Sequence, residues 1–513
     1  MSAPTKGKVY LLGAGPGDPE LITARALRRL GEADLVLYDA LVHPDLLEHV
    51  RPSAETVFVG KRAGRPSARQ QRINERMLEA ARAGRIVARL KGGDPYLFGR
   101  GSEEAELLAE HGVPFEVVPG VPSPMAAMAY AGISLTHRTR SSSVAYLTAT
   151  ESVQKDASSH DWAKLATGPQ TLVIFMGMRK LPTLMRRLIE HGRPADTPAA
   201  VVQWASLPKQ RTVVGTVATI AERAREAGLG LPALTIVGDV VELRQTLRWY
   251  DTQPLFGRRV LVTRPAHQSQ AISRMLRDHG AEPICVPAIR IEPPEDAGPL
   301  REAVADAGRY RWVVFTSRNG VRAFFEEVAR QERDSRVLGG ARICAIGPAT
   351  AEELTVHGLR PDVIPEEFKG EGAAEAVMAA DPDLAGHRVL LPRAAVARQA
   401  LPEMLREAGA EVDVVPAYQT LGASEGDAIR LRELIHHRRV DVLTFTSPST
   451  VREVAGALGE HADAIGEGFT IACIGPITAA AAEERGWPVH VVPEDYTAEG
   501  LLDALVTHHA EGA

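Results

Sequence analysis

Short apolar runs alternate with longer amphipathic stretches along the first half of the chain, and each run ends in a small or polar turn. The runs lie within residues 9–12, 34–38, 56–59 and 86–88. Such runs predict buried strands, and apolar residues spaced three or four apart between them predict helices. The pattern indicates an α/β fold, in which the chemistry is expected at the carboxyl ends of the strands.

The first of these strands runs into a glycine-rich turn at residues 13–18. Asp18 is predicted to cap a helix that starts with a proline and ends at Gly31. Such a turn suits a dinucleotide pyrophosphate, but its third glycine comes one residue early for that motif and a proline lies inside it. A nicotinamide oxidoreductase is therefore a disfavoured alternative, which a titration with NADH tests.

The stretch least like ordinary structure covers residues 89–101, where four glycines separate a predicted strand from a helix with Ser102 as its candidate N-cap. The glycines allow the backbone to approach a ligand at positions where a Cβ would clash. Asp94 is held extended by the proline that follows it and is expected to accept hydrogen bonds from a ligand amine or hydroxyl. The alternative is a plain strand-to-helix turn.

Asp39 and Lys61 each follow another predicted strand. Strand ends are where α/β proteins carry their chemistry, but a helix cap for Asp39 and a solvated charge for Lys61 are equally good interpretations. Residues 67–83 then predict a helix that begins with a capping box of Ser67 and Gln70.

Composition limits the class of protein. A chain of 513 residues with a net charge of -6 has room for about three domains and argues against a general nucleic-acid binder. The start has no secretory apolar region and no run has the length of a membrane span, so a cytoplasmic protein is expected. Cys285, Cys344 and Cys473 lie in apolar contexts without a histidine cluster and are interpreted as small hydrophobic residues, with no metal site expected.

The second half contains an internal duplication. Residues 259–265 return as residues 388–394, and other segments repeat at an offset of 128 to 130 residues. This offset is too long for a solenoid and predicts two similar α/β domains. Residues 247–259 have no periodicity, so the boundary between the halves is expected there. The other repeated pairs are 285–288 with 414–417, 314–317 with 444–447, 344–348 with 473–476, and 368–372 with 496–500.

Six motifs in the first half, in this order and spacing, resemble uroporphyrinogen-III C-methyltransferase over roughly the first 245 residues. The resemblance implies an S-adenosyl-L-methionine enzyme of the tetrapyrrole-methylase fold, with two α/β lobes and the cofactor between them. The motifs are Gly-x-Gly-Pro-Gly-Asp at 13–18, Tyr-Asp-x-Leu-Val at 38–42, Val-Gly-Lys-Arg at 59–62, Gly-Gly-Asp-Pro-x-x-Phe-Gly-Arg-Gly at 92–101, Val-Pro-Gly at 118–120 and Leu-Thr-His-Arg at 135–138.

The same resemblance implies roles for individual residues. Asp39 and Lys61 occupy the positions of acid and base. The family usually has a threonine where this chain has Pro122, so binding there is expected to use backbone groups. The implied cofactor contacts are Pro16, Gly92, Gly93, Asp94, Leu97, Pro122, Ser123, Met176 and Ala205.

The substrate implied by this resemblance carries eight carboxylates, which local positive charge must meet in an acidic protein. The alternative for each of these cations is a solvated face. The candidate cations are Lys61, Arg62, Arg65, His137, Arg138 and Arg140.

The second half resembles uroporphyrinogen-III synthase over about residues 257–513. That family closes hydroxymethylbilane into a ring while inverting the last pyrrole. Tyr418 falls where the family has a tyrosine at the cleft and is expected to assist loss of the substrate hydroxyl. Plain helix capping is the alternative for any single serine or threonine. The other candidate cleft residues are Thr263, Arg264, Ser317, Asn319, Arg393 and Ser447.

Together these resemblances imply a bifunctional enzyme that makes uroporphyrinogen III and then methylates it twice to precorrin-2, toward siroheme or cobalamin. The expected modules are residues 1–246 and 257–513, joined by a linker at 247–256. The second module is expected to divide into one lobe of residues 257–289 with 420–513 and another of 290–419.

Three alternatives remain beside this interpretation. One is another tetrapyrrole or RNA methylase of the same fold, and one is the nicotinamide enzyme. The third is a second half that binds a tetrapyrrole without catalysis. The expected partners are small tetrapyrroles, with no nucleic acid and no membrane, and the methyltransferase module is the candidate interface of a homodimer.

Overall fold

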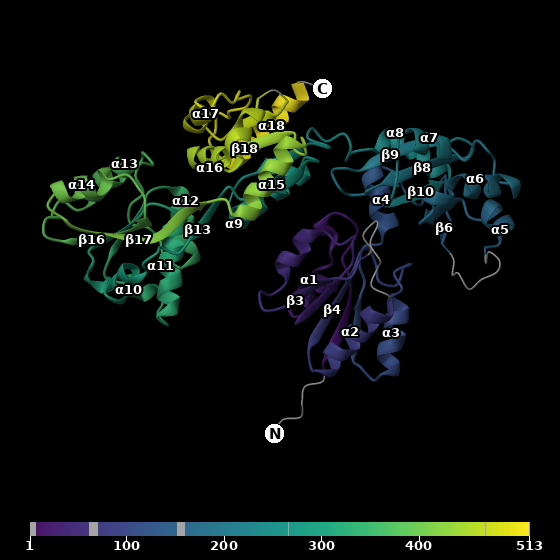
Figure 1. Cartoon of the computed structure of the whole chain (residues 1–513), viewed down its shortest axis with the longest axis horizontal. Coiled ribbons are helices and arrows are strands. Elements are labelled where there is room, and N and C mark those ends of the chain that lie inside the picture. Colours follow the sequence, from purple (N-terminus) through teal and green to yellow (C-terminus); the bar gives the residue numbers. More distant parts are fainter. Residues whose placement is uncertain (1–6, 61–69, 151–159, 265, 467, 512–513) are drawn as a thin grey trace. The chain divides into compact units, whose positions relative to one another are not determined.

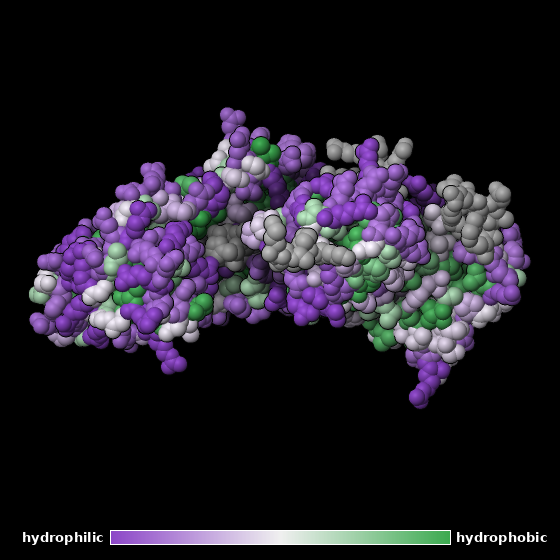
Figure 2. Space-filling model, turned by 90° about the horizontal axis from the view of Figure 1, so that it is seen from below, coloured by the Kyte–Doolittle hydropathy of each residue, from purple (hydrophilic) through white to green (hydrophobic). Residues whose placement is uncertain are grey.

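The computed structural model describes residues 7–60, 70–150, 160–264, 266–466 and 468–511. The chain forms two compact units, the first mainly from residues up to 259 with 275–282 and 506–513, the second from 260–274 and 283–505 (Figure 1). The face seen in Figure 2 is largely hydrophilic, with apolar residues gathered in patches. Within the described ranges, no helix is both long enough and apolar enough to cross a bilayer.

The first sheet is parallel throughout, in the order β3-β2-β4-β1-β5. Side chains of β1 alternate between two cores: Val9 and Leu11 pack with α2 and α3, whereas Tyr10 and Leu12 pack with α1. Figure 1 shows the sheet between these helices. The elements are β1 (Lys8–Gly13), β2 (Leu35–Tyr38), β3 (Glu55–Phe58), β4 (Ile86–Lys91), β5 (Phe115–Val118), α1 (Ala24–Gly31), α2 (Gln70–Arg82) and α3 (Gly101–Glu110).

The second sheet is mixed, in the order β6-β7-β10-β8-β9, with only the β6–β7 pair parallel. Helices α5, α6 and α7 cover one face, and α4 packs on the other. The elements are α4 (Ser123–Ala131), β6 (Val144–Thr148), α5 (Trp162–Thr167), β7 (Thr171–Phe175), α6 (Leu181–Glu190), β8 (Pro198–Gln203), β9 (Arg211–Thr216), α7 (Ile220–Glu226), β10 (Ala233–Val237) and α8 (Arg244–Leu247).

Two further sheets follow in the second half. A four-stranded sheet has the order β12-β11-β18-β19, from β11 (Arg259–Val262), β12 (Glu282–Cys285), β18 (Val442–Phe445) and β19 (Thr470–Cys473). A five-stranded sheet has the order β13-β17-β16-β14-β15, from β13 (Ile289–Glu292), β14 (Trp312–Phe315), β15 (Arg342–Ala345), β16 (Arg388–Ala394) and β17 (Glu411–Gly422). The helices are α9 (Ala266–Asp278), α10 (Gly298–Ala305), α11 (Arg318–Arg330), α12 (Pro348–Val356), α13 (Gly370–Ala380), α14 (Ala400–Glu407), α15 (Glu425–His436), α16 (Pro448–Leu458), α17 (Pro476–Glu483) and α18 (Ala498–Glu511).

The internal duplication extends to individual backbone hydrogen bonds. Ile346 N–H donates to the carbonyl of Phe315 at 3.0 Å, and its counterpart Ile474 donates to the carbonyl of Phe445 at 2.9 Å. Both bonds join neighbouring parallel strands where they end. The two copies are interleaved, because β11 and β12 of the first copy share a sheet with β18 and β19 of the second, and β14 and β15 of the first share the other sheet with β16 and β17 of the second.

Two predicted helix starts are wrong. Asp18 caps only a short 3-10 turn, where it accepts from Glu20 N–H, and α1 begins after a second cap, Thr23. Ser102 is not an N-cap, because α3 already begins at Gly101, whose N–H donates to the carbonyl of Pro95 at 2.9 Å. Ser67, the predicted cap of α2, lies outside the described residues.

Candidate active sites

The two glycine-rich turns of the first half lie against each other. Gly93 N–H donates to the carbonyl of Gly15 at 2.8 Å, and Gly15 N–H returns a bond of 3.3 Å. Both glycines have left-handed backbones, with φ of +72°, a conformation that other residues seldom adopt. A Cβ on Gly13 would lie 2.4 Å from the backbone nitrogen of Gly120. Glycine is thus required where three strand-end turns meet backbone to backbone.

Asp94 fastens two of these turns. Its Oδ1 accepts from Tyr96 N–H at 2.8 Å, and its Oδ2 accepts from Gly120 N–H at 3.1 Å. Each carboxylate oxygen has a second lone pair, so the group retains capacity to accept from a ligand. The predicted contact of Asp94 with a ligand stays a prediction. Its hydrogen bonds to two turns were not predicted from the sequence.

Pro16 and Ala205 come from turns in different lobes of the first half and are joined by Ser206. The hydroxyl of Ser206 donates to the carbonyl of Pro16 at 2.5 Å and accepts from Asp18 N–H at 3.1 Å. A Cβ on Gly17 would lie 2.5 Å from the Ala205 carbonyl oxygen. Sequence reasoning missed Ser206, for which adjacency to Ala205 was the one available signal.

Of the remaining predicted cofactor residues, Gly92 belongs to the central turn and Ser123 lies beside it. Ser123 N lies 3.6 Å from the position of a Cβ on Gly93, and Pro122 precedes α4 without a side-chain cap. Leu97 packs against the core cluster that includes Phe175. Met176, the residue after Phe175 in the sequence, is 46 % exposed. Gly92 lies beside Leu41: a Cβ on Gly92 would lie 3.0 Å from the Cβ of Leu41. These backbone groups and apolar side chains fit a ligand held by backbone hydrogen bonds and apolar contact.

Backbone strain is concentrated around these turns. Seven non-glycine residues have positive φ in the described part of the chain, and five of them belong to the first half. Such conformations cost free energy and persist where function or packing requires them. The five are Phe98, Arg100, Met176, Trp204 and Ser206.

Asp39 is held by a buried ionic network that the sequence analysis missed. Arg89 Nη2 donates to Asp39 Oδ1 at 2.6 Å, and Arg89 Nε donates to Glu104 Oε1 at 3.2 Å. Lys91 Nζ also donates to Glu104, at 3.1 Å, and burial lowers the pKa of this lysine. Glu104 has an exposed fraction of 0 %. The network reaches from the core to a carboxylate at the strand end.

The predicted substrate cations of the first half have different outcomes. Lys61, Arg62 and Arg65 lie outside the described residues. His137 and Arg138 are exposed, whereas Arg140 is already engaged by an ion pair with Glu242. The last finding favours a structural interpretation for Arg140.

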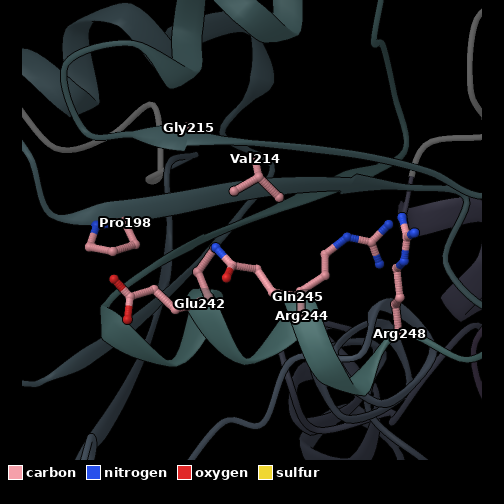
Figure 3. Close-up of a pocket in the computed structure, with 8 residues that line it drawn as sticks. Pro198, Val214, Gly215, Glu242, Arg244, Gln245 and Arg248 are labelled. Carbon is pink, nitrogen blue, oxygen red and sulfur yellow. The ribbon is translucent and has the colours of Figure 1, made fainter.

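A pocket of about 540 Å³ lies elsewhere in the first half. Figure 3 shows Arg244 and Arg248 extending toward the same side of it. Arg244 pairs with Asp251 and donates to the carbonyl of Ala131 at 2.5 Å, so its charge is compensated within the fold. None of the predicted site residues is among its lining residues, which are Pro198, Val214, Gly215, Val241, Glu242, Arg244, Gln245 and Arg248.

In the second half, Tyr418, which lies within β17, meets Ser317, which follows β14. The Tyr418 hydroxyl and the Ser317 hydroxyl are 3.0 Å apart, and Ser317 also accepts from Gly320 N–H, which caps α11. Asn319 is in the first turn of this helix. Ser447 caps α16 in the same way, by accepting from Thr450 N–H. Capping is therefore one role of both serines.

Two predicted arginines occupy equivalent positions in the duplication. Arg264 Nε donates to the Thr446 hydroxyl at 3.2 Å, and Arg393 Nη1 donates to the carbonyl of Arg398 at 2.8 Å. Burial lowers the pKa of both guanidinium groups. Thr263 is buried, and its hydroxyl donates to the carbonyl of Thr444 at 2.9 Å.

Two family descriptions match separate parts of the chain. Residues 8–221 match Tetrapyrrole (Corrin/Porphyrin) Methylases, and residues 270–503 match Uroporphyrinogen-III synthase HemD. The chain is 38% identical to Porphyrin biosynthesis protein HemD of Ruminiclostridium josui over 98% of either chain. It is 40% identical to Uroporphyrinogen-III C-methyltransferase of Bacillus subtilis over 69% of this chain and 72% of that protein. A solved Uroporphyrin-III C-methyl transferase from Thermus thermophilus, complexed with S-adenyl homocysteine, is 41% identical, covers 46% of this chain and 99% of its own, and has a TM-score of 0.40.

Proposed function

Since the chain belongs to the porphyrin-biosynthesis family that joins a tetrapyrrole methylase to a uroporphyrinogen-III synthase, we propose that it catalyses two consecutive reactions. The second half closes hydroxymethylbilane to uroporphyrinogen III with inversion of the last ring. The first half then adds two methyl groups to give precorrin-2, on the way to siroheme or cobalamin. The observation that carries the proposal is the meeting of the glycine turns with Ala205 and Ser206 in the first half.

The cofactor of the first half is S-adenosyl-L-methionine, which when bound supplies an electrophilic methyl group. The Gly93 carbonyl accepts from Gly15 N–H and has a second lone pair for the cofactor, and Gly92 has no side chain to block its approach. Met176 is proposed to offer it an apolar contact. Displacement at a methyl group depends mainly on how two reactants are positioned, so rigid turns suit this reaction. The other residues proposed to hold it are Pro16, Asp94, Leu97, Pro122, Ser123 and Ala205.

Asp39 is the proposed proton acceptor of the methylation step. The macrocycle takes up the positive charge of the donor when one of its pyrrole carbons gains the methyl group, and it must afterwards lose a proton, which a fixed carboxylate can take. The 2.6 Å bond from Arg89 orients one oxygen of Asp39 and leaves the other for this task. Lys61 is proposed as the partner acid, and Arg62, His137 and Arg138 as contacts for substrate carboxylates.

Tyr418 is the proposed catalytic residue of ring closure. Its hydroxyl can donate to the hydroxyl group that leaves the linear substrate as water, while Ser317 at 3.0 Å fixes the orientation of the phenol. Half-buried Arg264 and buried Arg393 carry charge that suits substrate carboxylates. Thr263, Asn319 and Ser447 complete the proposed cleft residues.

The proposed division of labour assigns methylation to residues 1–246 and ring closure to 257–513, with 247–256 as linker. The second module is proposed to have lobes of 257–289 with 420–513 and of 290–419. The methyltransferase module remains the proposed interface of a homodimer.

Each reaction is tested separately on the purified full-length chain. Hydroxymethylbilane alone should give the III isomer, separated from the spontaneous I isomer by chromatography after oxidation. Uroporphyrinogen III with S-adenosyl-L-methionine should give a methylated macrocycle. If ring closure gives only the I isomer while methylation proceeds, the second half binds a tetrapyrrole without catalysis.

A further inference from the structure

Two aromatic side chains stand exposed at equivalent positions of the duplicated units. Phe368 and Tyr496 are each 60 % exposed. Each ring lies over a glycine: the nearest ring atom is 3.4 Å from the Cβ position of Gly347 for Phe368, and 3.3 Å from that of Gly475 for Tyr496. One face of each ring is thus supported by backbone, and the rest of the ring is available.

The loops that carry the rings have the same conformation. Lys369 N–H donates to the carbonyl two residues earlier at 2.8 Å, and Thr497 N–H makes the same bond at 2.8 Å. A Cβ on Gly372 would lie 2.4 Å from the Glu367 carbonyl oxygen, and the equivalent distance at Gly500 is 2.2 Å. The backbone is therefore held in the same way at each residue that carries a ring.

Each ring lies beside the turn that follows an edge strand, one in each of the two sheets that bear the proposed site residues. Gly347 follows β15, and Ser317 follows β14, which is the parallel neighbour of β15. Gly475 follows β19, and Ser447 follows β18, which is the parallel neighbour of β19. The carboxyl ends of parallel strands are the usual place of a ligand in α/β folds.

A single exposed aromatic residue is unremarkable, but a ring held by the same backbone bonds in both copies calls for a shared ligand. We propose that Phe368 and Tyr496 each stack on a pyrrole ring of the linear tetrapyrrole, one in each duplicated unit. The pyrrole is flat, aromatic and apolar on its faces, so it suits an offset-stacked contact. The proposal rests on the synthase activity proposed above and specifies how the substrate of that activity is bound.

The test measures steady-state ring closure by Phe368→Ala and Tyr496→Ala in the full-length chain. Loss of one stacking contact should raise KM for hydroxymethylbilane about three- to tenfold and change kcat less. Phe368→Tyr and Tyr496→Phe keep a ring and should retain the wild-type KM. Phe368→Leu keeps an apolar side chain without a ring and should behave like the alanine variant.

Val356→Ala is the matched control, because Val356 is apolar and 76 % exposed at the last residue of α12. Methylation of added uroporphyrinogen III should be unchanged in all variants. If the wild-type chain does not close hydroxymethylbilane into a ring, the synthase assignment itself is wrong. An active wild type whose KM is unchanged by both alanine substitutions, or raised equally by Val356→Ala, overturns the stacking proposal alone.

Discussion

The guanidinium of Arg89 donates a hydrogen bond of 2.6 Å to the carboxylate of Asp39. Arg89 is itself held by Glu104, a carboxylate with no exposed surface. A buried charge is tolerated when it is paired and hydrogen-bonded, and breaking one pair leaves another charge uncompensated. The orientation of the proposed proton acceptor is therefore set by the core of the first sheet.

Arg89→Lys should slow methylation and leave ring closure unchanged. The ammonium keeps the charge but cannot bridge Asp39 and Glu104 as a planar guanidinium does, so Asp39 loses its fixed orientation. We expect kcat for methylation of uroporphyrinogen III to fall about tenfold to a hundredfold. Lys91→Met is the matched control, since Lys91 is equally buried and contacts Glu104 but makes no hydrogen bond to Asp39. An equal fall in both variants would show a general loss of stability instead.

Asp94→Ala should abolish methylation and leave ring closure intact. The substitution removes the acceptor for both Tyr96 N–H and Gly120 N–H, so two turns lose their shared brace. Binding of S-adenosyl-L-methionine, measured by calorimetry, should fall with activity. Asp94→Asn keeps one acceptor oxygen and should retain part of the binding. Loss of ring closure in Asp94→Ala would contradict the separation of the two activities.

Tyr418→Phe should slow ring closure and spare methylation of added uroporphyrinogen III. The change removes one oxygen and with it the 3.0 Å contact to Ser317, while the ring stays in its core cluster. A general acid contributes about a hundredfold or more, so kcat for formation of the III isomer should fall by that order. Ser317→Ala should cost less, because the phenol remains. A Tyr418→Phe enzyme with wild-type kcat rules out a role of the hydroxyl.

Asp381 should make the stability of the second half depend on pH. Arg311, with a further contribution from the Trp312 indole N–H, lowers the pKa of this carboxyl to about 2. Because the folded value is depressed, the stabilisation is present above the unfolded value and is lost as pH falls toward 2. Asp381→Asn should lower the free energy of unfolding by about 2 kcal/mol at pH 7, from lost charge-assisted hydrogen bonds.

Urea unfolding at pH 7, 5 and 3, followed by tryptophan fluorescence, checks this dependence. The difference in unfolding free energy between wild type and Asp381→Asn should shrink at pH 3. Asp383→Asn is the control, since Asp383 is an exposed neighbour and its substitution should have a small effect on stability. A constant difference for Asp381→Asn across this range contradicts the assignment.

The features that the sequence predicted well are local ones. Strand-end turns depend on glycine at fixed places, and Gly15 and Gly93 have the left-handed backbones that such turns require. The duplication is visible as repeated sequence segments, and Ser317 and Ser447 cap equivalent helices. Two helix starts were misplaced because Thr23 competed with Asp18, and because Gly101 approaches the Pro95 carbonyl too closely for a side chain.

The features that the sequence did not predict depend on contacts between distant segments. Arg89 and Lys91 alternate within the otherwise apolar strand β4, which is a signal of a buried ionic network, but their partner Glu104 is on a helix. The bond from Ser206 to the Pro16 carbonyl spans 190 residues. No local pattern encodes such pairs, because they arise only when the sheets are assembled.

The most direct test gives the purified full-length chain hydroxymethylbilane and S-adenosyl-L-methionine together and measures the mass of the macrocycle formed. The account predicts a ring of the III isomer that carries two added methyl groups, and an unmethylated III isomer when the methyl donor is omitted. A macrocycle of the spontaneous I isomer, or one without added methyl groups in the presence of the donor, would contradict it.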